Sequence, residues 1–236
     1  MFEAKVGTRN EEARILWLEQ ALTKIPKGSR ILDAGAGEQQ FKRFCSHFNY
    51  VSQDFAKYDG SGDSKGLQMG SWDQNNLDII CDITSIPEPD SSFDAILCTE
   101  VFEHLPDPLL ALKEFTRLLR PNGYLIITAP FCSLTHFSPY HYYSGFNRYF
   151  YEFHLAQDGF EIVDLQANGN FFEYLAQEIR RIPYVASTYS NNYLRIWERL
   201  ALKLLLNALE RFSDKDKGSS ALLSFGFHVM AVKKKN

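Results

Sequence analysis

The amino-acid sequence predicts an α/β domain of the doubly wound type, in which helices cover both faces of a mainly parallel sheet. Short apolar runs typical of buried strands alternate along the chain with amphipathic helical stretches, and a glycine-containing turn follows the first of these strands. In addition, acidic residues stand where successive strands end. The chain has 236 residues, of which 45% are hydrophobic and 23% charged, and this is enough to bury one such core. We therefore expect a single domain over 1–236, with added segments at about 131–151 and 170–217.

The first half of the chain supplies four predicted strands. Apolar residues recur at helical spacing before Pro26, and β-branched and aliphatic runs then alternate with polar stretches. The expected elements are a helix at 11–24, a strand at 30–33, a helix at 39–45, and strands at 49–53, 78–81 and 93–98. Residues 55–76 are polar and contain four glycines, so we expect a loop there and no regular helix.

The second half continues the same alternation. A helix that ends before Pro121-Asn-Gly123 feeds an apolar strand, and Gly159 precedes another. The expected elements are a helix at 109–119, a strand at 124–128, a helix at 152–157, a strand at 160–165, helices at 171–182 and 192–212, and a strand at 224–232.

The turn after the first strand has the features of a ligand site. Asp33 follows Ile31-Leu32, and Gly35 and Gly37 are spaced so that a ligand can approach the backbone closely. A dinucleotide fingerprint would need a third glycine, but the chain continues Glu38-Gln-Gln40. Because acids flank the turn, a pyrophosphate is disfavoured there and a ligand that carries an ammonium group is favoured.

The acids at the strand ends extend this prediction to a whole ligand. In open α/β sheets, ligands bind beyond the carboxyl ends of the strands, and Asp33, Asp54 and Asp82 end three successive strands. A carboxylate can accept from both hydroxyls of a ribose or from an adenine amino group. Asp54 suits the ribose, and Asp82 with Ile83 suits the adenine. The alternative is that each acid caps the turn or helix that follows it.

These motifs resemble those of class I S-adenosylmethionine-dependent methyltransferases that act on small molecules. The likeness is carried by Leu32-Asp-Ala-Gly-Ala-Gly37, by Glu103-His-Leu105 after the fourth strand, and by Leu118-Leu-Arg-Pro-Asn-Gly-Tyr124. It implies a seven-stranded, mostly parallel sheet of order 3-2-1-4-5-7-6, whose last strand, about 225–233, is antiparallel. It also implies S-adenosylmethionine as the cofactor. The residues that it places at the cofactor are Asp33, Ala34, Gly35, Ala36, Gly37, Asp54, Phe55, Asp82, Ile83, Cys98 and Thr99.

Methyl transfer to a hydroxyl needs a base as well as a cofactor, and three histidines are candidates. His104 follows the fourth strand, and His136 and His141 follow the fifth. The alternatives are a core or capping role for His104, and substrate contact for the other two. The aromatic residues around them resemble the segment found in methyltransferases of surface-glycan and secondary-metabolite clusters, where they could stack on a sugar. They could equally well only pack an aromatic and helical lid.

Other functional classes fit the sequence less well. A nicotinamide-dependent oxidoreductase would need the missing glycine and a Tyr-x-x-x-Lys pair, and a catalytically silent binding protein of the same fold would be expected to lose Asp54 or the glycines. With 25 Lys and Arg against 29 Asp and Glu, the net charge is −4, which does not favour nucleic acid as a partner. The four cysteines have no metal-ligand spacing, so we predict no metal site and expect free thiols. With no apolar leader and no run of 18 apolar residues, we expect a cytoplasmic protein without stable membrane insertion.

The helix expected at 192–212 has a role that the sequence leaves open. Leucines and other apolar residues recur every three or four positions along it, and they define one face of a helix. The positions are Leu194, Trp197, Leu200, Ala201, Leu204, Leu205 and Leu209. This face could cover the sheet, form a lid, or form the contact of a homodimer. Attachment to a membrane surface is less favoured, because the polar side lacks a dense Lys and Arg face.

Overall fold

The computed structural model describes residues 4–235. Residues 1–3, the start of the segment in which the sequence shows no apolar leader, lie outside the described residues, as does residue 236. The chain divides into two compact units. The larger comprises residues 16–166 with the strand and tail after 225, and the smaller comprises the N-terminal residues to 15 together with 167–225. The helix α1 (Asn10–Leu22) contributes to both.

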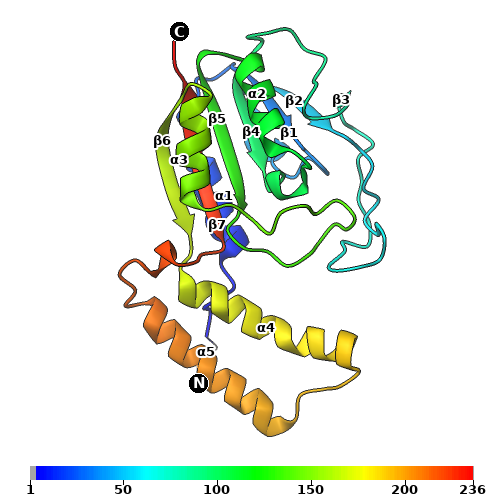
Figure 1. Cartoon of the computed structure of the whole chain (residues 1–236), viewed down its shortest axis with the longest axis vertical. Helices are drawn as coiled ribbons and strands as arrows, with labels where there is room; N and C mark the ends of the chain where they lie inside the picture. Colours follow the sequence, from blue (N-terminus) through cyan, green and yellow to red (C-terminus); the bar gives the residue numbers. More distant parts are fainter. Residues whose placement is uncertain (1–3, 236) are drawn as a thin grey trace. The chain divides into compact units, whose positions relative to one another are not determined.

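The larger unit is built on one seven-stranded sheet of order β3-β2-β1-β4-β5-β7-β6 (Figure 1). The strands are β1 (Arg30–Ala34), β2 (Asn49–Asp54), β3 (Ile79–Ile80), β4 (Phe93–Thr99), β5 (Leu119–Pro130), β6 (Phe160–Asn168) and β7 (Gly226–Lys233). Strands β1 to β5 are parallel to the strands with which they pair among themselves. The strand β7 pairs with β5 in the antiparallel direction, and Tyr124 lies opposite Val232. The predicted fold class and strand order are therefore confirmed.

The centre of the sheet is formed by strands whose side chains are buried on both faces. Ile31 and Leu32 of β1 and Ile96 and Leu97 of β4 have no exposed surface, as expected where helices cover a parallel sheet. The helix α2 (Pro108–Leu118) begins where Asp107 accepts from the first-turn amides, with proline at the start of the helix. The helix α3 (Arg148–Gln157) is capped by Asn147 in the same way. In Figure 1 both helices lie on one face of the sheet.

The helix predicted at 39–45 is wrong. The chain instead makes a turn that ends in the short 3₁₀ helix η1 (Lys42–Phe44). Gly37 and Gln39 both have a positive φ, 52° and 58°, and an α-helix cannot pass through left-handed residues. The strand predicted at 78–81 is also shorter, because only Ile79 and Ile80 pair with β2.

The smaller unit contains two long helices, α4 (Phe171–Ser190) and α5 (Ile196–Ser213), and the short η3 (Ser219–Ala221). Its core joins residues of the N-terminal segment with residues of both helices: Ala4, Val6, Ala176, Ile179 and Leu209. Within residues 4–235, no helix is both long and apolar enough to cross a membrane.

The buried face of α5 differs from the predicted one. Leu202 and Leu206 pack on the core around Leu209, whereas Trp197 and Leu204, which the sequence placed on the apolar face, are 62% and 60% exposed. The leucine spacing describes a broad apolar helix, of which the smaller unit covers only one side. The other side of α5, which carries Trp197, Leu200 and Leu204, is exposed, and we call it the exposed apolar stripe.

Candidate functional site

The turn between β1 and the following residues has a shape that only glycine can adopt. Gly35 and Gly37 have φ values of 77° and 52°. A Cβ atom on Gly37 would lie 2.6 Å from the ring of Trp72, and one on Gly35 would lie 2.5 Å from Val101. The amide of Gly35 donates to the backbone carbonyl of Gln53, which ties the turn to the end of β2.

Asp54 is held against this turn. Its Oδ2 accepts from the amide of Gly37 at 3.0 Å, and its Oδ1 accepts from the amide of Ala56 and from Nε2 of Gln74, both at 2.9 Å. The side chain is 7% exposed. The structure therefore brings together Asp54 and the glycine turn, which the sequence placed in one site although Gly37 and Asp54 are 17 positions apart in the chain.

Asp33 lies inside the sheet beside the same turn. It is 2% exposed, and the hydroxyl of Tyr50 donates to its Oδ2 at 2.6 Å. Burial raises the pKa of Asp33 to about 7; the Tyr50 hydrogen bond acts against this shift, and the charge of Asp54 adds to it. A cationic group nearby would favour the ionised form of such a carboxyl group.

Asp82 has a local role in the structure. Its Oδ1 accepts from both the amide and the hydroxyl of Thr84, at 2.9 and 2.7 Å. These bonds, the amide first, lower the pKa of Asp82. They match the turn-capping alternative that the sequence left open, while Ile83 beside it is buried.

The end of β4 supplies the remaining predicted cofactor residues. Asp33 lies opposite Leu97 in the strand register, so Cys98 and Thr99 extend just beyond it on the neighbouring strand. Both are buried, and burial raises the pKa of the Cys98 thiol. Among the described residues, the hydroxyl oxygen of Thr99 is buried without a hydrogen-bond partner. A ligand in this position would be able to satisfy it.

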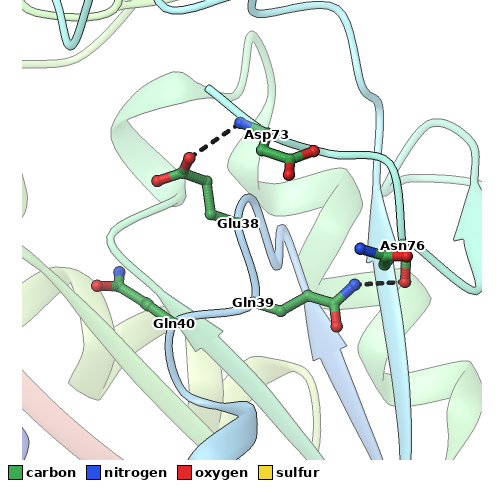
Figure 2. A pocket seen from close by; sticks show the side chains of 5 residues that line it. All are labelled: Glu38, Gln39, Gln40, Asp73 and Asn76. Atoms are coloured by element: carbon green, nitrogen blue, oxygen red, sulfur yellow. Dashed lines mark hydrogen bonds between the residues drawn. The ribbon is translucent and has the colours of Figure 1, made fainter. Parts of the chain in front are cut away.

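The segment at 55–76 closes over the glycine turn. An open pocket of about 420 Å³ lies here, lined by Glu38, Gln39, Gln40, Asp73 and Asn76. Figure 2 shows Glu38 accepting from the amide of Asp73, at 2.9 Å, and Gln39 donating to the carbonyl of Asn76. Trp72 lies against Gly37, and Gln74 donates to Asp54. Together these contacts place residues 55–76, here called the polar loop, beside the glycine turn at 35–37. No signal in the sequence marks them, because each partner comes from an irregular segment.

The three candidate histidines form one cluster at the same end of the sheet. The ring centre of His136 lies 4.7 Å from that of His104 and 4.8 Å from that of His141. His104 ends the 3₁₀ helix η2 (Phe102–His104), and the other two belong to the segment after β5. That segment is joined to the polar loop by a bridge between His136 and Leu67. The structure thus assembles residues that the sequence predicted separately.

Glu103 is the member of this cluster that the sequence analysis missed. Its side chain is 1% exposed, and its Oε1 lies 3.7 Å from Nε2 of His104 and 3.8 Å from Nε2 of His136. Its carbonyl oxygen accepts from the amides of Tyr142 and Tyr143, which fixes the histidine-bearing segment against η2. Glu103 belongs to the motif Glu103-His-Leu105, which carries part of the family likeness.

His104 is held as a neutral imidazole. Its Nδ1 lies 2.6 Å from the carbonyl oxygen of Tyr140, and Phe137 stacks on its ring. Burial, followed by the neighbouring His136, lowers the pKa of His104 to about 3. Burial also lowers the pKa of His141. His104 is therefore a weak proton acceptor near neutrality, although its sequence position made it the first candidate base.

Comparison with known proteins finds likenesses to methyltransferases in both sequence and fold. The profile of the family described as "Methyltransferase domain" matches residues 8–188. A ubiquinone biosynthesis O-methyltransferase of Coxiella burnetii is 29% identical over 125 residues, which cover 49% of this chain and 48% of that protein. The chain spans less than half the length of the curated relatives that it matches.

Two solved structures share the fold. A SAM-dependent methyltransferase from Archaeoglobus fulgidus has a TM-score of 0.56 at 16% identity, with 96% of this chain and 95% of that chain covered. The phosphoethanolamine N-methyltransferase 2 of Haemonchus contortus, in complex with S-adenosyl-L-methionine, has a TM-score of 0.52 at 17% identity. That match covers 92% of this chain and 52% of the other. At these identities the likeness concerns the fold.

Proposed function

Because this chain belongs to the methyltransferase-domain family, we propose that it transfers a methyl group from S-adenosylmethionine to a small-molecule acceptor. The observation that carries the proposal is the bond between the Gly37 amide and the Asp54 carboxylate. It sets an acid beside a glycine turn at the carboxyl ends of β1 and β2, where open α/β sheets bind ligands.

The residues present fit this cofactor. Asp54 would accept hydrogen bonds from the ribose hydroxyls. One of these hydroxyls would replace the side-chain amide of Gln74, which donates to Asp54 in the structure. Asp33 would face the positively charged amino-acid end, and the unsatisfied hydroxyl of Thr99 offers a further polar contact. We retain Ala34, Ala36, Phe55, Asp82, Ile83 and Cys98 as proposed neighbours of the cofactor.

The bound cofactor supplies an activated methyl group, so the chain has mainly to position the reactants. Such positioning can contribute about 7–11 kcal/mol to lowering a barrier. The polar loop and the segment after β5 meet through hydrogen bonds such as that from the Leu67 amide to the carbonyl of Thr135, 3.0 Å long. Together they would orient the acceptor and exclude water from it.

We further propose that the acceptor is a hydroxyl of a sugar, a glycan or a secondary metabolite. Aromatic side chains remain exposed beside the histidine cluster, Tyr142 at 50% and Tyr143 at 39%. Such rings can stack on a sugar face while imidazole groups form hydrogen bonds to its hydroxyls. His136, His141 and, less favourably, His104 would then receive or relay the hydroxyl proton.

We also propose a homodimer that forms through 192–212. The support is the exposed apolar stripe of α5, because contiguous apolar surface of this kind marks interaction sites. Sedimentation should show a wild-type dimer and a folded monomer after Leu204→Glu with Leu205→Glu. A wild-type monomer would remove the proposal.

We propose a cytoplasmic location for the protein. The four cysteines are free, which supports a reducing, cytoplasmic setting.

Calorimetry with three ligands tests the proposed activity. S-adenosylmethionine and S-adenosylhomocysteine should bind with one site per chain, whereas NAD should not bind, because the third glycine of its fingerprint is absent. Saturable NAD binding without binding of S-adenosylhomocysteine would overturn the proposal in favour of an oxidoreductase.

A further inference from the structure

We propose that Glu103, His104 and His136 form a binding site for a divalent transition-metal ion of the zinc type. One ligand atom from each residue lies within 4.8 Å of the other two. The site lies at the histidine cluster and shares no residue with the glycine turn. Its role in methyl transfer rests on the proposed function, but the binding of a metal does not.

The hydrogen bonds at the two histidines orient their lone pairs toward Glu103. Nδ1 of His104 faces the Tyr140 carbonyl at 2.6 Å, and Nδ1 of His136 faces the Leu134 carbonyl at 2.8 Å. A carbonyl oxygen can only accept, so Nδ1 carries the proton in both rings and Nε2 carries the lone pair. This is the arrangement in which a metal-binding histidine donates its other N–H to a backbone carbonyl.

Two imidazole lone pairs therefore converge on one carboxylate oxygen. The Nε2 atoms lie 3.7 and 3.8 Å from Oε1 of Glu103. Ligand atoms about 2.0–2.1 Å from a tetrahedral zinc ion are about 3.3–3.4 Å apart, so each Nε2–Oε1 distance would shorten by a few tenths of an ångström on binding. The three ligand atoms lie within 4.8 Å of one another, so the two imidazole nitrogens would approach each other by up to about 1.4 Å.

The neighbouring groups support the same geometry. Ser133 donates its hydroxyl to the Ser144 carbonyl, so its oxygen is free to accept from Nε2 of His141 at 3.2 Å. His141 then keeps the lone pair on Nδ1, and its ring centre lies 4.8 Å from that of His136. His141 therefore lies beside the site, where it can contact the group that occupies the open position.

The chemistry of these ligands indicates the class of metal. Two imidazoles and one carboxylate form the ligand set of catalytic zinc sites, which keep a further position open, and of several other first-row metals. Magnesium is disfavoured, because it prefers a shell of oxygen atoms. The side chains of His104 and His136 are 13% and 23% exposed, so the site is neither sealed nor fully solvated.

A metal here would activate an acceptor hydroxyl without the need for a side-chain base. As the oxygen binds the ion, the O–H bond breaks and its proton passes to solvent, leaving a metal-bound alkoxide as the nucleophile. His104 would then act as a ligand, through the Nε2 atom that faces Glu103.

The test is a titration of chelator-treated protein with Co²⁺, followed by its visible absorption, and with Zn²⁺ by calorimetry. We expect one ion per chain and an absorption band typical of a mixed nitrogen and oxygen site. His136→Ala should weaken binding by at least tenfold, and Glu103→Gln likewise. His47→Ala removes an exposed histidine elsewhere in the larger unit and should bind the ions as the wild type does.

Binding of S-adenosylhomocysteine by the same samples separates the outcomes. A folded protein that binds S-adenosylhomocysteine but no Co²⁺, or whose Co²⁺ binding survives His136→Ala, overturns the metal site and leaves the methyltransferase proposal standing. Histidine-dependent Co²⁺ binding without binding of S-adenosylhomocysteine supports the metal site and overturns the proposed function. If the buried Glu103→Gln variant does not fold, the partly exposed His136→Ala variant decides.

Discussion

Asp54 is the residue around which the candidate site is organised. Its two oxygens accept from the glycine turn, from Ala56 and from Gln74, so one carboxylate fixes three segments of the larger unit. Such a residue is both a ligand contact and a structural support. Binding and stability must therefore be measured separately for any substitution of it.

Asp54→Ala should weaken binding of S-adenosylhomocysteine by about 1–3 kcal/mol, the range for leaving a polar group of the ligand unpaired. Calorimetry would measure the change, and circular dichroism would confirm that the variant is folded. Glu161→Ala removes an exposed acid from β6 and should bind like the wild type. Equal affinity in the Asp54 variant would exclude this residue from the cofactor site.

Asp33 predicts a pH dependence of stability. Its pKa is raised to about 7, so the folded state disfavours the ionised form, and the stability present below pH 4 is lost as the pH rises toward 7. Asp33→Asn keeps an acceptor for Tyr50 and cannot ionise. As the pH rises from 4 to 7, the free energy of unfolding of the variant should therefore increase by up to about 4 kcal/mol relative to that of the wild type. This value corresponds to a pKa about three units higher in the folded than in the unfolded state.

Chemical unfolding of both proteins across this pH range measures the difference directly. Using the difference cancels the other titrating groups, which the two proteins share. Curves that stay parallel from pH 4 to 7 would show that Asp33 is ionised at little cost, contrary to its burial.

At the scale of elements, strands and glycine turns were the most predictable features. Most strands of the sheet were placed within three residues, because buried apolar runs such as Ile31-Leu32 leave few alternatives. The exception is β5, which begins at Leu119, five residues before its predicted start. The helix at 39–45 was wrong, because its sequence does not reveal the left-handed residues at Gly37 and Gln39. The cluster around Glu103 could not be predicted, because its side chains come from the short helix η2 and from a segment after β5 that has no periodic pattern.

The helix α5 shows the same limit, because leucine spacing identifies a helix but does not say which side is covered. Leu204 is 60% exposed, whereas Leu209 is 4% exposed and belongs to the core of the smaller unit. Leu209→Ala should therefore lower the free energy of unfolding by about 2–5 kcal/mol, and Leu204→Ala should lower it by less than about 0.5 kcal/mol in the monomer.

Denaturant unfolding at low protein concentration compares the two substitutions. Both remove the same atoms from the same helix, so a difference between them reports burial alone. Similar losses at both positions would mean that the stripe around Leu204 is covered in solution.

At the scale of the whole molecule, the chain is divided between two units of unequal size. Among the described residues, the smaller unit relies on a core cluster of five buried residues that includes Leu209. The larger relies on a seven-stranded sheet with helices on its faces. Local stability follows the amount of buried apolar contact. The two units are therefore expected to open with different free energies.

Hydrogen exchange should show this difference. Amides of β1, β4 and β5 should be protected at close to the global free energy of unfolding, whereas those of α5 should exchange through smaller, local openings. Mass spectrometry of peptides from the native protein would measure both sets at once. Equal protection of the two sets would indicate that the units unfold as one.

The place of β7 has a consequence for synthesis on the ribosome. It follows every other strand in the sequence, yet it lies between β5 and β6, so β6 joins the sheet only through it. While the chain emerges from the exit tunnel, β5 has an unpaired edge until residues 226–233 arrive. At about 5–20 residues per second, the roughly one hundred residues after β5 leave that edge open for several seconds. Unpaired edges promote aggregation, so this nascent chain should depend on chaperones until β7 has been inserted.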